Sequence, residues 1–367
     1  MRPRRILHVI TDLYLAGAET MLARLAAAQP GLADETVVVS LLPDGFHTER
    51  LRAAGVTVVE LNFRTTAGIA RGMLQLARLI GKQRPEIVQG WMYHGDLAAL
   101  LALVLSGRRR TTRLAWNIRC STLDFARYSR QLRLVVRACA MLSRRPDLII
   151  ANSGAGMEAH HALGYRPRRA EVVANGIEID RYKPDPGART AVRRELGIAD
   201  GAFVVAHVAR VDPMKDHLGF LRAMAKVPHV HALLVGAGTD DLPSQPNVHR
   251  LGRRTDVECL LAAADAVVSS SAFGEGFSNA LAEGMACGLP PVATDVGDAA
   301  AIVGTTGLLV PPRDPDALAE AIRALSEEPG ERRAERGRQA RSRIVENFSL
   351  ARALEQFSDA YATLLRN

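Results

Sequence analysis

The chain has 367 residues, of which 48% are hydrophobic and 23% are charged. This length favours two domains, and the composition excludes a disordered chain because it supplies enough apolar residues for sizeable cores. The net charge of +8 is uneven, since residues 1–180 carry 25 Lys and Arg against 15 Asp and Glu. The basic half favours an anionic lipid surface, a phosphate-bearing molecule or nucleic acid as partner. Nucleic acid is the weakest of these, because no nucleic-acid-binding motif is present.

The start of the chain resembles a secretion signal only briefly. Arginines precede apolar residues there, but His8 and Asp12 interrupt the apolar run, so we expect no signal peptide. The longest apolar segment, residues 97–105, is too short to span a membrane. The cysteines lack metal-ligand spacing, so we expect free thiols in a reducing cytoplasm. They are Cys120, Cys139, Cys259 and Cys287.

Short apolar segments alternate with amphipathic stretches along nearly the whole chain, a pattern typical of parallel sheets with helices on both faces. We therefore predict an α/β protein with two Rossmann-like domains facing across a cleft, and ligands bound beyond the carboxyl ends of the strands. The predicted strands are residues 6–10, 36–42, 56–61, 87–91, 113–118 and 148–151, then 203–208, 231–235, 248–251, 266–269, 291–293 and 307–310.

Turn residues suggest where one domain ends. Asn175-Gly176 forms a turn, and residues 183–187, Lys-Pro-Asp-Pro-Gly, are the best linker candidate. We expect domains over residues 1–180 and 181–345, with residues 346–367 as a closing helix. Residues 327–343 should form a charged, solvated helix. The closing helix shows apolar residues at helical spacing, namely Leu354, Phe357, Tyr361 and Leu364.

The most informative stretch is SSSAFGEGFSNALAEGMACG, residues 269–288, where an apolar run leads through a Gly-bearing turn into a helix. Free backbone N–H groups and the helix dipole at such a place can hold an anion. The flanking carboxylates, Glu275 and Glu283, should then face neutral hydroxyls such as those of a sugar or ribose. Glu320 and Glu328 have the same spacing, so the spacing alone does not distinguish this stretch from an ordinary turn with solvated carboxylates.

Two cations follow the strand predicted at residues 203–208. Arg210 offers a planar fork and Lys215 a compact charge, and together they suit a diphosphate, although a pair of surface cations on a loop is the alternative. The chain contains no Asp-x-Asp tripeptide, so no obvious carboxylate pair is offered to a catalytic metal, and we predict no metal site.

The stretch around Glu275 and Glu283, together with Arg210 and Lys215, resembles the donor-sugar motifs of retaining GT-B glycosyltransferases, in particular glycosyltransferase family 4, the glycosyl transferases group 1. The resemblance covers nearly the whole chain in family order. It implies that the last helix crosses back onto the N-terminal domain, that Arg210 and Lys215 neutralise the nucleotide phosphates, that Glu275 holds the sugar and that Glu283 holds the ribose.

Further positions follow from the same resemblance. His94, after a strand, would face the donor sugar, although a lone His is as often structural. Gly17 would let backbone approach the diphosphate, but relatives usually carry two adjacent glycines and this chain has Ala16 first. The remaining donor-binding predictions are Gly238, Leu251, Gly252, Gly276, Phe277, Ser278 and Asn279, and the acceptor-side predictions, for which structural roles are the alternative, are Asn117, Arg119 and Asn152.

The resemblance thus implies a metal-independent, retaining hexosyltransferase that needs no cofactor and uses a nucleotide-diphosphate sugar as co-substrate, with UDP expected before GDP or ADP. The acceptor would be a glycan or a lipid-linked saccharide in the synthesis of cell-surface polysaccharide or glycoconjugate. The base contacts would be made by backbone, so the side chains do not reveal the base. A sugar-nucleotide 2-epimerase of the same architecture and a non-catalytic sugar-nucleotide-binding protein are the alternatives.

Arginines gather in one part of the basic half. Arg130, Arg133 and Arg137 fall at helical spacing with apolar neighbours, and a basic amphipathic helix can lie on an anionic membrane. A solvated helix face is the alternative. We expect a cytoplasmic protein with peripheral contact to the inner face of the membrane and no nucleic-acid partner. The other arginines of this region are Arg108, Arg109, Arg110, Arg113, Arg127, Arg144 and Arg145.

Overall fold

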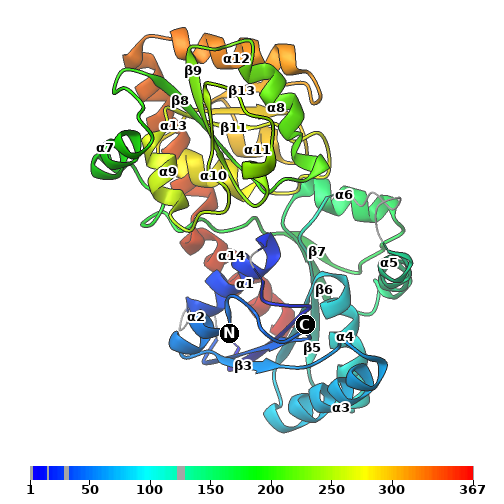
Figure 1. Ribbon diagram of the computed structural model, residues 1–367. Coiled ribbons are helices and arrows are strands. Elements are labelled where there is room, and N and C mark those ends of the chain that lie inside the picture. The colour runs from blue at the N-terminus through cyan, green and yellow to red at the C-terminus, as the bar shows by residue number, and fades with distance from the viewer. Residues whose placement is uncertain (1–2, 15, 29–32, 122–128, 367) are drawn as a thin grey trace. The chain divides into compact units, whose positions relative to one another are not determined.

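The computed structural model describes residues 3–14, 16–28, 33–121 and 129–366 (Figure 1). The chain divides into two compact units, which we call unit 1, Met1–Gly176 with Leu350–Asn367, and unit 2, Ile177–Ser349. Each unit is built around one parallel sheet, so the predicted α/β class with two Rossmann-like sheets is confirmed. Every predicted strand is present, and its ends differ from the prediction by at most two residues.

The sheet of unit 1 has the strand order β3-β2-β1-β4-β5-β6-β7, and all of its pairs are parallel. Its central strands are buried on both faces, which explains why most of their residues are apolar. The strands are β1 (Arg5–Ile10), β2 (Glu35–Ser40), β3 (Thr57–Glu60), β4 (Ile87–Trp91), β5 (Arg113–Ile118), β6 (Leu148–Ala151) and β7 (Ala170–Val172).

Two separate hydrophobic cores cover the two faces of this sheet. In β5, Leu114, Trp116 and Ile118 join one core, and Ala115 joins the other, because successive side chains of a strand point to opposite faces. The first core contains α3 (Thr66–Gln83), α4 (Met92–Leu105), α5 (Arg130–Leu142) and α6 (Gly154–Ala162), and the second contains α1 (Gly17–Ala27), α2 (Thr48–Ala53) and α14 (Leu350–Arg366).

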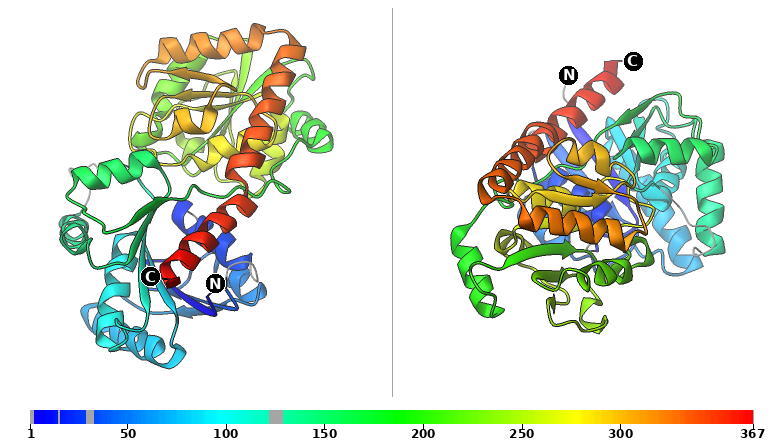
Figure 2. Two further views of the ribbon diagram at one scale, coloured as in Figure 1. Left: turned by 180° about the vertical axis from the view of Figure 1, so that it is seen from behind. Right: turned by 90° about the horizontal axis from the view of Figure 1, so that it is seen from above.

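The closing helix α14 belongs to unit 1, as the sequence predicted (Figure 2). Phe357 stacks on Trp91 of β4 with ring centroids 6.3 Å apart and an interplanar angle of 25°. The Tyr361 hydroxyl donates a hydrogen bond to Gln89 of the same strand. Phe357, Tyr361 and Leu364 are buried, so the apolar stripe read from the sequence is the face that covers the sheet.

The sheet of unit 2 has the order β10-β9-β8-β11-β12-β13 and is also parallel. The helices α8 and α12 share the hydrophobic core on one face of this sheet. Helix α9 packs against β8, and α10 packs against β8 and β11. Helix α7 packs on α9, and α13 packs on α10. The strands are β8 (Phe203–Val208), β9 (Val230–Val235), β10 (Val248–Arg250), β11 (Ala266–Ser269), β12 (Pro291–Thr294) and β13 (Leu308–Val310). The helical elements are α7 (Pro186–Glu195), η1 (Pro213–Lys215), α8 (His217–Met224), η2 (Thr239–Asp241), α9 (Val257–Ala263), α10 (Asn279–Ala286), α11 (Ala299–Val303), α12 (Pro315–Glu327) and α13 (Gly330–Phe348).

Two sequence interpretations differ from the structure. The segment proposed as a linker, residues 183–187, lies inside unit 2, where Asp185 caps α7 and Pro186 occupies its first turn. The charged segment 327–343 is not one solvated helix. α12 ends at Glu327, α13 begins at Gly330, and α13 buries Ala340 and Ile344.

The chain passes between the units at two adjacent places. Gly176 ends the first part of unit 1, and a Cβ added there would lie 2.7 Å from the Cα of Leu350, where the chain re-enters unit 1. Within unit 2, the N–H of Ile177 donates to the carbonyl of Phe348 at 2.8 Å. The predicted Asn175-Gly176 turn therefore falls at the boundary.

The four cysteine thiols are free, and burial raises the pKa of the Cys120 thiol to about 11. Over the described ranges, no helix combines the length and the apolar character needed to cross a bilayer.

We predict that Phe357→Ala destabilises the protein by about 3–5 kcal/mol, because it leaves a cavity between α14 and Trp91. Urea unfolding followed by tryptophan fluorescence measures the change, since both Trp residues lie in unit 1. Asp359→Ala, at an exposed position of the same helix, should change stability by less than about 0.5 kcal/mol. Equal effects of the two substitutions would mean that α14 does not seal the core.

Candidate functional site

Both sheets contain a place where the strand order reverses, between β1 and β4 in unit 1 and between β8 and β11 in unit 2. At such a switch point the two connections leave in opposite directions, and the crevice beyond the carboxyl ends of the strands binds ligands in open α/β sheets. Gly17 and His94 follow β1 and β4, and Lys215 and Glu275 follow β8 and β11. The structure thus places four predicted site residues at the two switch points.

Lys215 and Glu275 form an ion pair at the switch point of unit 2. The Lys215 ammonium donates to the Glu275 carboxylate, and the Ser271 hydroxyl donates to the same carboxylate oxygen, Oε2, at 2.8 Å. The two charged side chains are only 20% and 10% exposed, so water screens the pair less than it screens a surface ion pair. An ammonium has three donors, so Lys215 can hold Glu275 and still offer donors to an anion.

The backbone of Lys215 is fixed by the loop that follows β11. The Ser270 hydroxyl donates to the carbonyl of Lys215 at 2.7 Å, and the N–H of Ala272 donates to the carbonyl of Met214 at 2.8 Å. His207 Nε2 lies 2.9 Å from the Ser270 oxygen. Because the Ser270 proton is used on Lys215, we assign Nε2 of His207 as a donor. Adjacent serines thus hold the two members of the ion pair.

His207 is buried beneath this loop. Its ring lies 4.9 Å from that of His217 and 4.6 Å from that of Phe220, measured between centroids. Burial holds the pKa of His207 well below its ordinary value, with smaller contributions from the nearby charges of His217 and Lys215. A neutral imidazole is consistent with the donor role of Nε2, and it adds no positive charge beside Lys215.

Two glycines allow the turn that carries Glu275. Gly274 has φ +78°, and Gly297, after β12, has φ +62°. A Cβ at Gly297 would lie 1.9 Å from the carbonyl oxygen of Glu275, so the two loops can approach this closely only because a glycine is present. The N–H of Asp298 donates to the carbonyl of Gly276 at 3.3 Å and fastens the same contact.

Helix α10 begins beside the ion pair. Its N-cap residue, Ser278, makes no side-chain capping bond to the first turn of the helix. Phe277 is buried against Phe348, with ring centroids 5.4 Å apart, and this contact fixes the entry into the helix. Glu283 lies two thirds of the way along α10 and is buried.

A small pocket joins Lys215 to the start of α10. A cation beside a helix N-terminus suits an anion. The lining residues come from β8, β11, their exits and the start of α10, namely His207, Val208, Ala209, Lys215, Val268, Ser269, Ser271, Ser278, Ala280 and Leu281.

Arg210, the other predicted cation, lies nearer to the solvent. Its side chain is 61% exposed and its guanidinium lies 3.4 Å from the carboxylate of Asp212. A weak, exposed pair of this kind leaves the guanidinium able to turn towards a ligand. The structure therefore separates the two predicted cations into a fixed one, Lys215, and an exposed one, Arg210.

The exits of β9 and β10 are tied together by backbone hydrogen bonds. Gly236 donates to the carbonyl of Gly252 at 2.8 Å, and Gly252 donates to the Thr239 hydroxyl at 3.0 Å. Leu251 donates to the carbonyl of Leu234, and Gly238 has φ +83°. The N–H groups of Leu251 and Gly252 are therefore used inside unit 2, which leaves carbonyl groups and surface shape as their means of contact with a ligand.

In unit 1, the chain turns directly from β4 into α4. Met92 takes φ +60°, which is rare for a residue other than glycine, and no loop separates the strand from the helix. A Cβ at Gly95 would lie 2.5 Å from the carbonyl oxygen of Val9, so the first turn of α4 packs directly on β1. His94 lies exposed in that turn, and partial burial lowers its pKa. Gly17 is likewise exposed, at the first position of α1.

Arg119, predicted on the acceptor side, is held inside unit 1. Its guanidinium donates to Asn175 Oδ1 at 2.7 Å and lies over the rings of Trp91 and Phe357, 5.0 and 5.5 Å from their centroids. Burial lowers the pKa of Arg119 to about 9. These contacts give Arg119 a structural role, because they fasten α14 and the boundary turn to the sheet.

Asn117 and Asn152, the other acceptor-side predictions, also lie at strand exits but are buried. The N–H of Asn117 donates to Asp96 Oδ1 at 3.1 Å, and Asn152 accepts from the Ser153 hydroxyl at 3.2 Å. Burial raises the pKa of Asp96 well above its ordinary value, and the hydrogen bond from the Asn117 N–H opposes this shift.

Sequence reasoning missed Ser270, Ser271, His207 and Gly297. The two serines belong to the same Ser-rich exit of β11 that the motif includes, so their position was a usable signal. His207 and Gly297 lie on other elements, and their contacts with the site arise only from the pairing of β8 with β11 and of β11 with β12.

Two parallel sheets of the order found here, with a closing helix that returns to the first unit, are the GT-B architecture. The model of "Glycosyltransferase Family 4" matches residues 15–181 and that of "Glycosyl transferases group 1" matches residues 202–328. The two matches together span most of the chain. The protein belongs to glycosyltransferase family 4.

Individual relatives agree with this family. The D-inositol 3-phosphate glycosyltransferase of Kribbella flavida is 31% identical over 214 residues, which are 51% of this chain and 50% of that protein. The matches span about half the length of such curated relatives. The crystal structure of Anabaena Alr3699/HepE in complex with UDP-glucose is 25% identical, with a TM-score of 0.85 over 98% of this chain and 99% of that chain. The apo form of the lipopolysaccharide outer core galactosyltransferase WaaB shares the fold at 16% identity, with a TM-score of 0.67 over 98% and 99% of the two chains.

We predict that Gly297→Ala displaces the Glu275 turn without removing any side chain of the site. The added Cβ would meet the Glu275 carbonyl and would sit at φ +62°, which should destabilise the protein by about 1–3 kcal/mol. Urea unfolding measures the change. Gly201→Ala is the matched control, since a Cβ there meets nothing within 4 Å, and comparable losses in both variants would contradict this account of Gly297.

We also predict that His207 makes stability depend on pH. The folded-state pKa of His207 lies below the unfolded value of about 6.5, so its contribution is complete above that pH and is lost as the pH falls below it. The slope should reach about 1.4 kcal/mol per pH unit for one such group. Urea unfolding at pH 7.0 and below, followed by circular dichroism, should show a shallower loss in His207→Gln. His229→Gln, at an exposed position, should keep the wild-type slope.

Proposed function

We propose that the protein is a metal-independent, retaining hexosyltransferase that moves a sugar from a nucleotide-diphosphate donor to a glycan or lipid-linked saccharide. The observation that carries the proposal is the Lys215–Glu275 pair at the switch point of unit 2, beside the start of α10. Unit 2 would bind the donor, and the basic unit 1 would face the acceptor and the inner surface of a membrane. The product would enter cell-surface polysaccharide or glycoconjugate.

Negative charge on the diphosphate grows as the bond to the sugar breaks. Lys215, whose position is fixed before the donor binds, would stabilise that charge without reorganisation, and the exposed Arg210 would turn onto the same group. The N–H groups at the start of α10, near Phe277 and Ser278, would add further donors. This use of two cations supports transfer without a metal.

The carboxylates would bind the neutral parts of the donor. Glu275 would accept hydrogen bonds from sugar hydroxyls while Lys215 and Ser271 hold it in one orientation, and Glu283 would bind the ribose hydroxyls. His94 would contact the sugar as a neutral imidazole, which its lowered pKa favours. UDP is the preferred nucleotide because the Anabaena relative was crystallised with UDP-glucose.

A panel of UDP-, GDP- and ADP-sugars, tested by thermal shift with and without EDTA, examines the donor site. Binding to the native state raises the melting temperature by mass action, so a UDP-sugar should raise it and EDTA should not change the shift. A shift with no nucleotide sugar would overturn the donor site. Product analysis without acceptor separates the alternatives, since an epimerase would convert the nucleotide sugar alone.

We predict that Lys215→Ala weakens UDP binding by roughly 10- to 100-fold, because it removes a charge-assisted hydrogen bond to the diphosphate. Lys226→Ala is the matched control, as Lys226 is an exposed lysine that pairs with Asp316. Glu283→Ala should weaken UDP binding as well, with Glu320→Ala as its control. Titration calorimetry measures both. Unchanged affinity in both site variants would show that the donor binds elsewhere.

A further inference from the structure

Helices α3, α4 and α5 pack side by side on one face of the unit 1 sheet, and their solvent-facing sides form a surface that we call the outer face (Figure 1). Soluble proteins rarely gather large exposed apolar side chains in one place. Seven of the thirteen exposed large hydrophobic residues among the described ones lie on these three helices. They are Ile69, Leu74, Leu101, Val104, Leu105, Leu134 and Met141.

Helix α5 carries the clearest part of the outer face. It buries Val136 towards the sheet, as a helix of a globular domain does. Its opposite side presents a second apolar stripe that folding does not use, with Leu134 at 63% and Met141 at 80% exposure. Arg130 and Arg137 alternate with these residues at spacings of four and three, so all four share one side of the helix.

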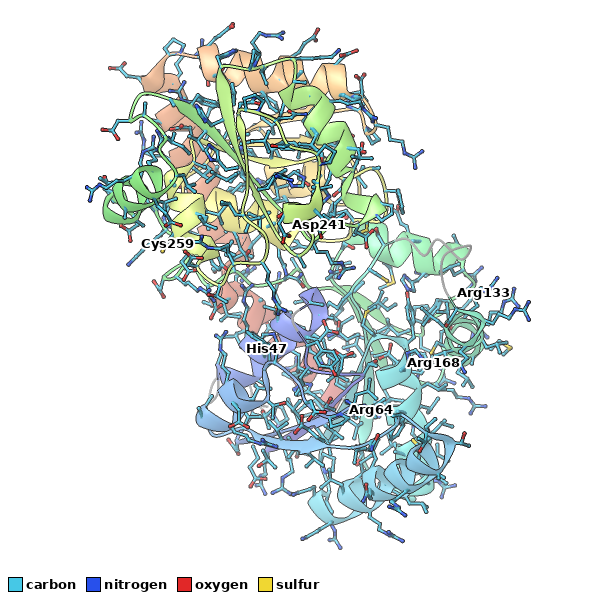
Figure 3. The ribbon with its side chains drawn as sticks, viewed as in Figure 1. His47, Arg64, Arg133, Arg168, Asp241 and Cys259 are labelled. Carbon is cyan, nitrogen blue, oxygen red and sulfur yellow. The ribbon has the colours of Figure 1, made fainter. Side chains whose placement is uncertain are left out.

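The outer face contains almost no negative charge. The three helices together hold one carboxyl group, that of Asp96, and it is fully buried. Arg133 lies on the part of α5 at the margin of unit 1 (Figure 3). In the segments that follow α4 and α5, Arg109 pairs with Asp147. The basic residues of the helices and of these segments are Arg71, Arg78, Lys82, Arg108, Arg109, Arg110, Arg130, Arg133, Arg137, Arg144 and Arg145.

The exposed side of helix α13 in unit 2 offers a comparison within the same protein. Glutamates lie among its arginines, and Arg338 pairs with Glu335 while Arg336 pairs with Glu328 of the preceding segment. The arginines of α5 have no acidic neighbour on their own helix. The outer face therefore differs from an ordinary solvated face in both its charge and its apolar exposure.

We propose that the outer face docks on the surface of an anionic lipid bilayer, with Leu134 and Met141 entering the interface and Arg130 and Arg137 contacting lipid phosphates. The exposed Leu and Met side chains match the apolar interior of a bilayer, and the guanidinium groups of the arginines match the anionic phosphates at its surface. Docking would bring the protein to a lipid-linked acceptor, so the biological role of the outer face rests on the proposed transfer. Vesicle binding itself can be measured without any transfer reaction. A nucleic-acid ligand would match the arginines and leave the apolar side chains unexplained.

Co-sedimentation of the full chain with phosphatidylcholine vesicles, with and without phosphatidylglycerol, tests the docking. The protein should bind only the anionic vesicles. Arg130→Gln with Arg137→Gln should lower the partition coefficient roughly 30-fold. Leu134→Ser with Met141→Ser should also weaken vesicle binding. Raised salt screens the attraction between arginines and lipid phosphates, so the binding that the wild type keeps at raised salt comes from its apolar side chains and should be lost in this variant.

Matched changes in unit 2 provide the controls. Arg332→Gln with Arg338→Gln, and Leu218→Ser with Leu309→Ser, remove exposed residues of the same types from unit 2 and should leave vesicle binding unchanged. In Met141→Trp, the emission of the new indole should shift to shorter wavelength on anionic vesicles, since an indole entering the interface leaves water. An unshifted emission, or equal binding by the outer-face variants and the wild type, would overturn the proposal.

Two further measurements separate this proposal from the others. Every variant should keep the thermal shift with a UDP-sugar, so a loss of vesicle binding would not reflect a damaged donor site. If the wild type ignores vesicles and instead self-associates through these residues in sedimentation velocity, or binds RNA in their place, the lipid surface is the wrong partner. Failure of the UDP-sugar shift alone would refute the transferase site and leave the docking result standing.

Discussion

The constraint on which both units depend is that every strand of each sheet runs parallel to its neighbours. In such a sheet all strands end at one edge, and each connection must cross a face before the next strand begins. Because the order reverses between β8 and β11, the connections leave these two strands in opposite directions. Lys215 and Glu275, sixty residues apart in sequence, meet there, and Ser270 and Ser271 fix the backbone of one and the carboxylate of the other.

Much of the fold could be predicted from the sequence, because the central strands are short, mostly apolar segments and α14 has a single apolar stripe. The boundary between the units could not be located from turn composition alone. Residues 183–187 have the composition of a linker, yet Pro186 suits the first turn of a helix that Asp185 caps. The boundary at Gly176 coincides with the predicted Asn175-Gly176 turn, and its close approach to Leu350, a contact between distant parts of the chain, distinguishes it from residues 183–187.

The sequence motifs were enough to name residues of the candidate site, but they did not predict which of these residues contact one another. Glu275 was identified by its neighbours in sequence, but its pairing with Lys215 depends on the strand order of the folded sheet. Arg119 stands at a strand exit, as a ligand-binding residue would, and is instead covered by Trp91 and Phe357. The covering ring of Phe357 comes from a helix more than two hundred residues later, so the burial of Arg119 could not be anticipated.

The return of α14 to unit 1 also orders the events of folding during synthesis. Unit 2 is one continuous segment, Ile177–Ser349, and can fold as soon as it leaves the ribosome. Unit 1 begins before unit 2 in the chain but lacks the helix that covers Trp91 until residues 350–366 are made. The core between α14 and the unit 1 sheet is therefore completed only after the whole of unit 2 has been synthesised.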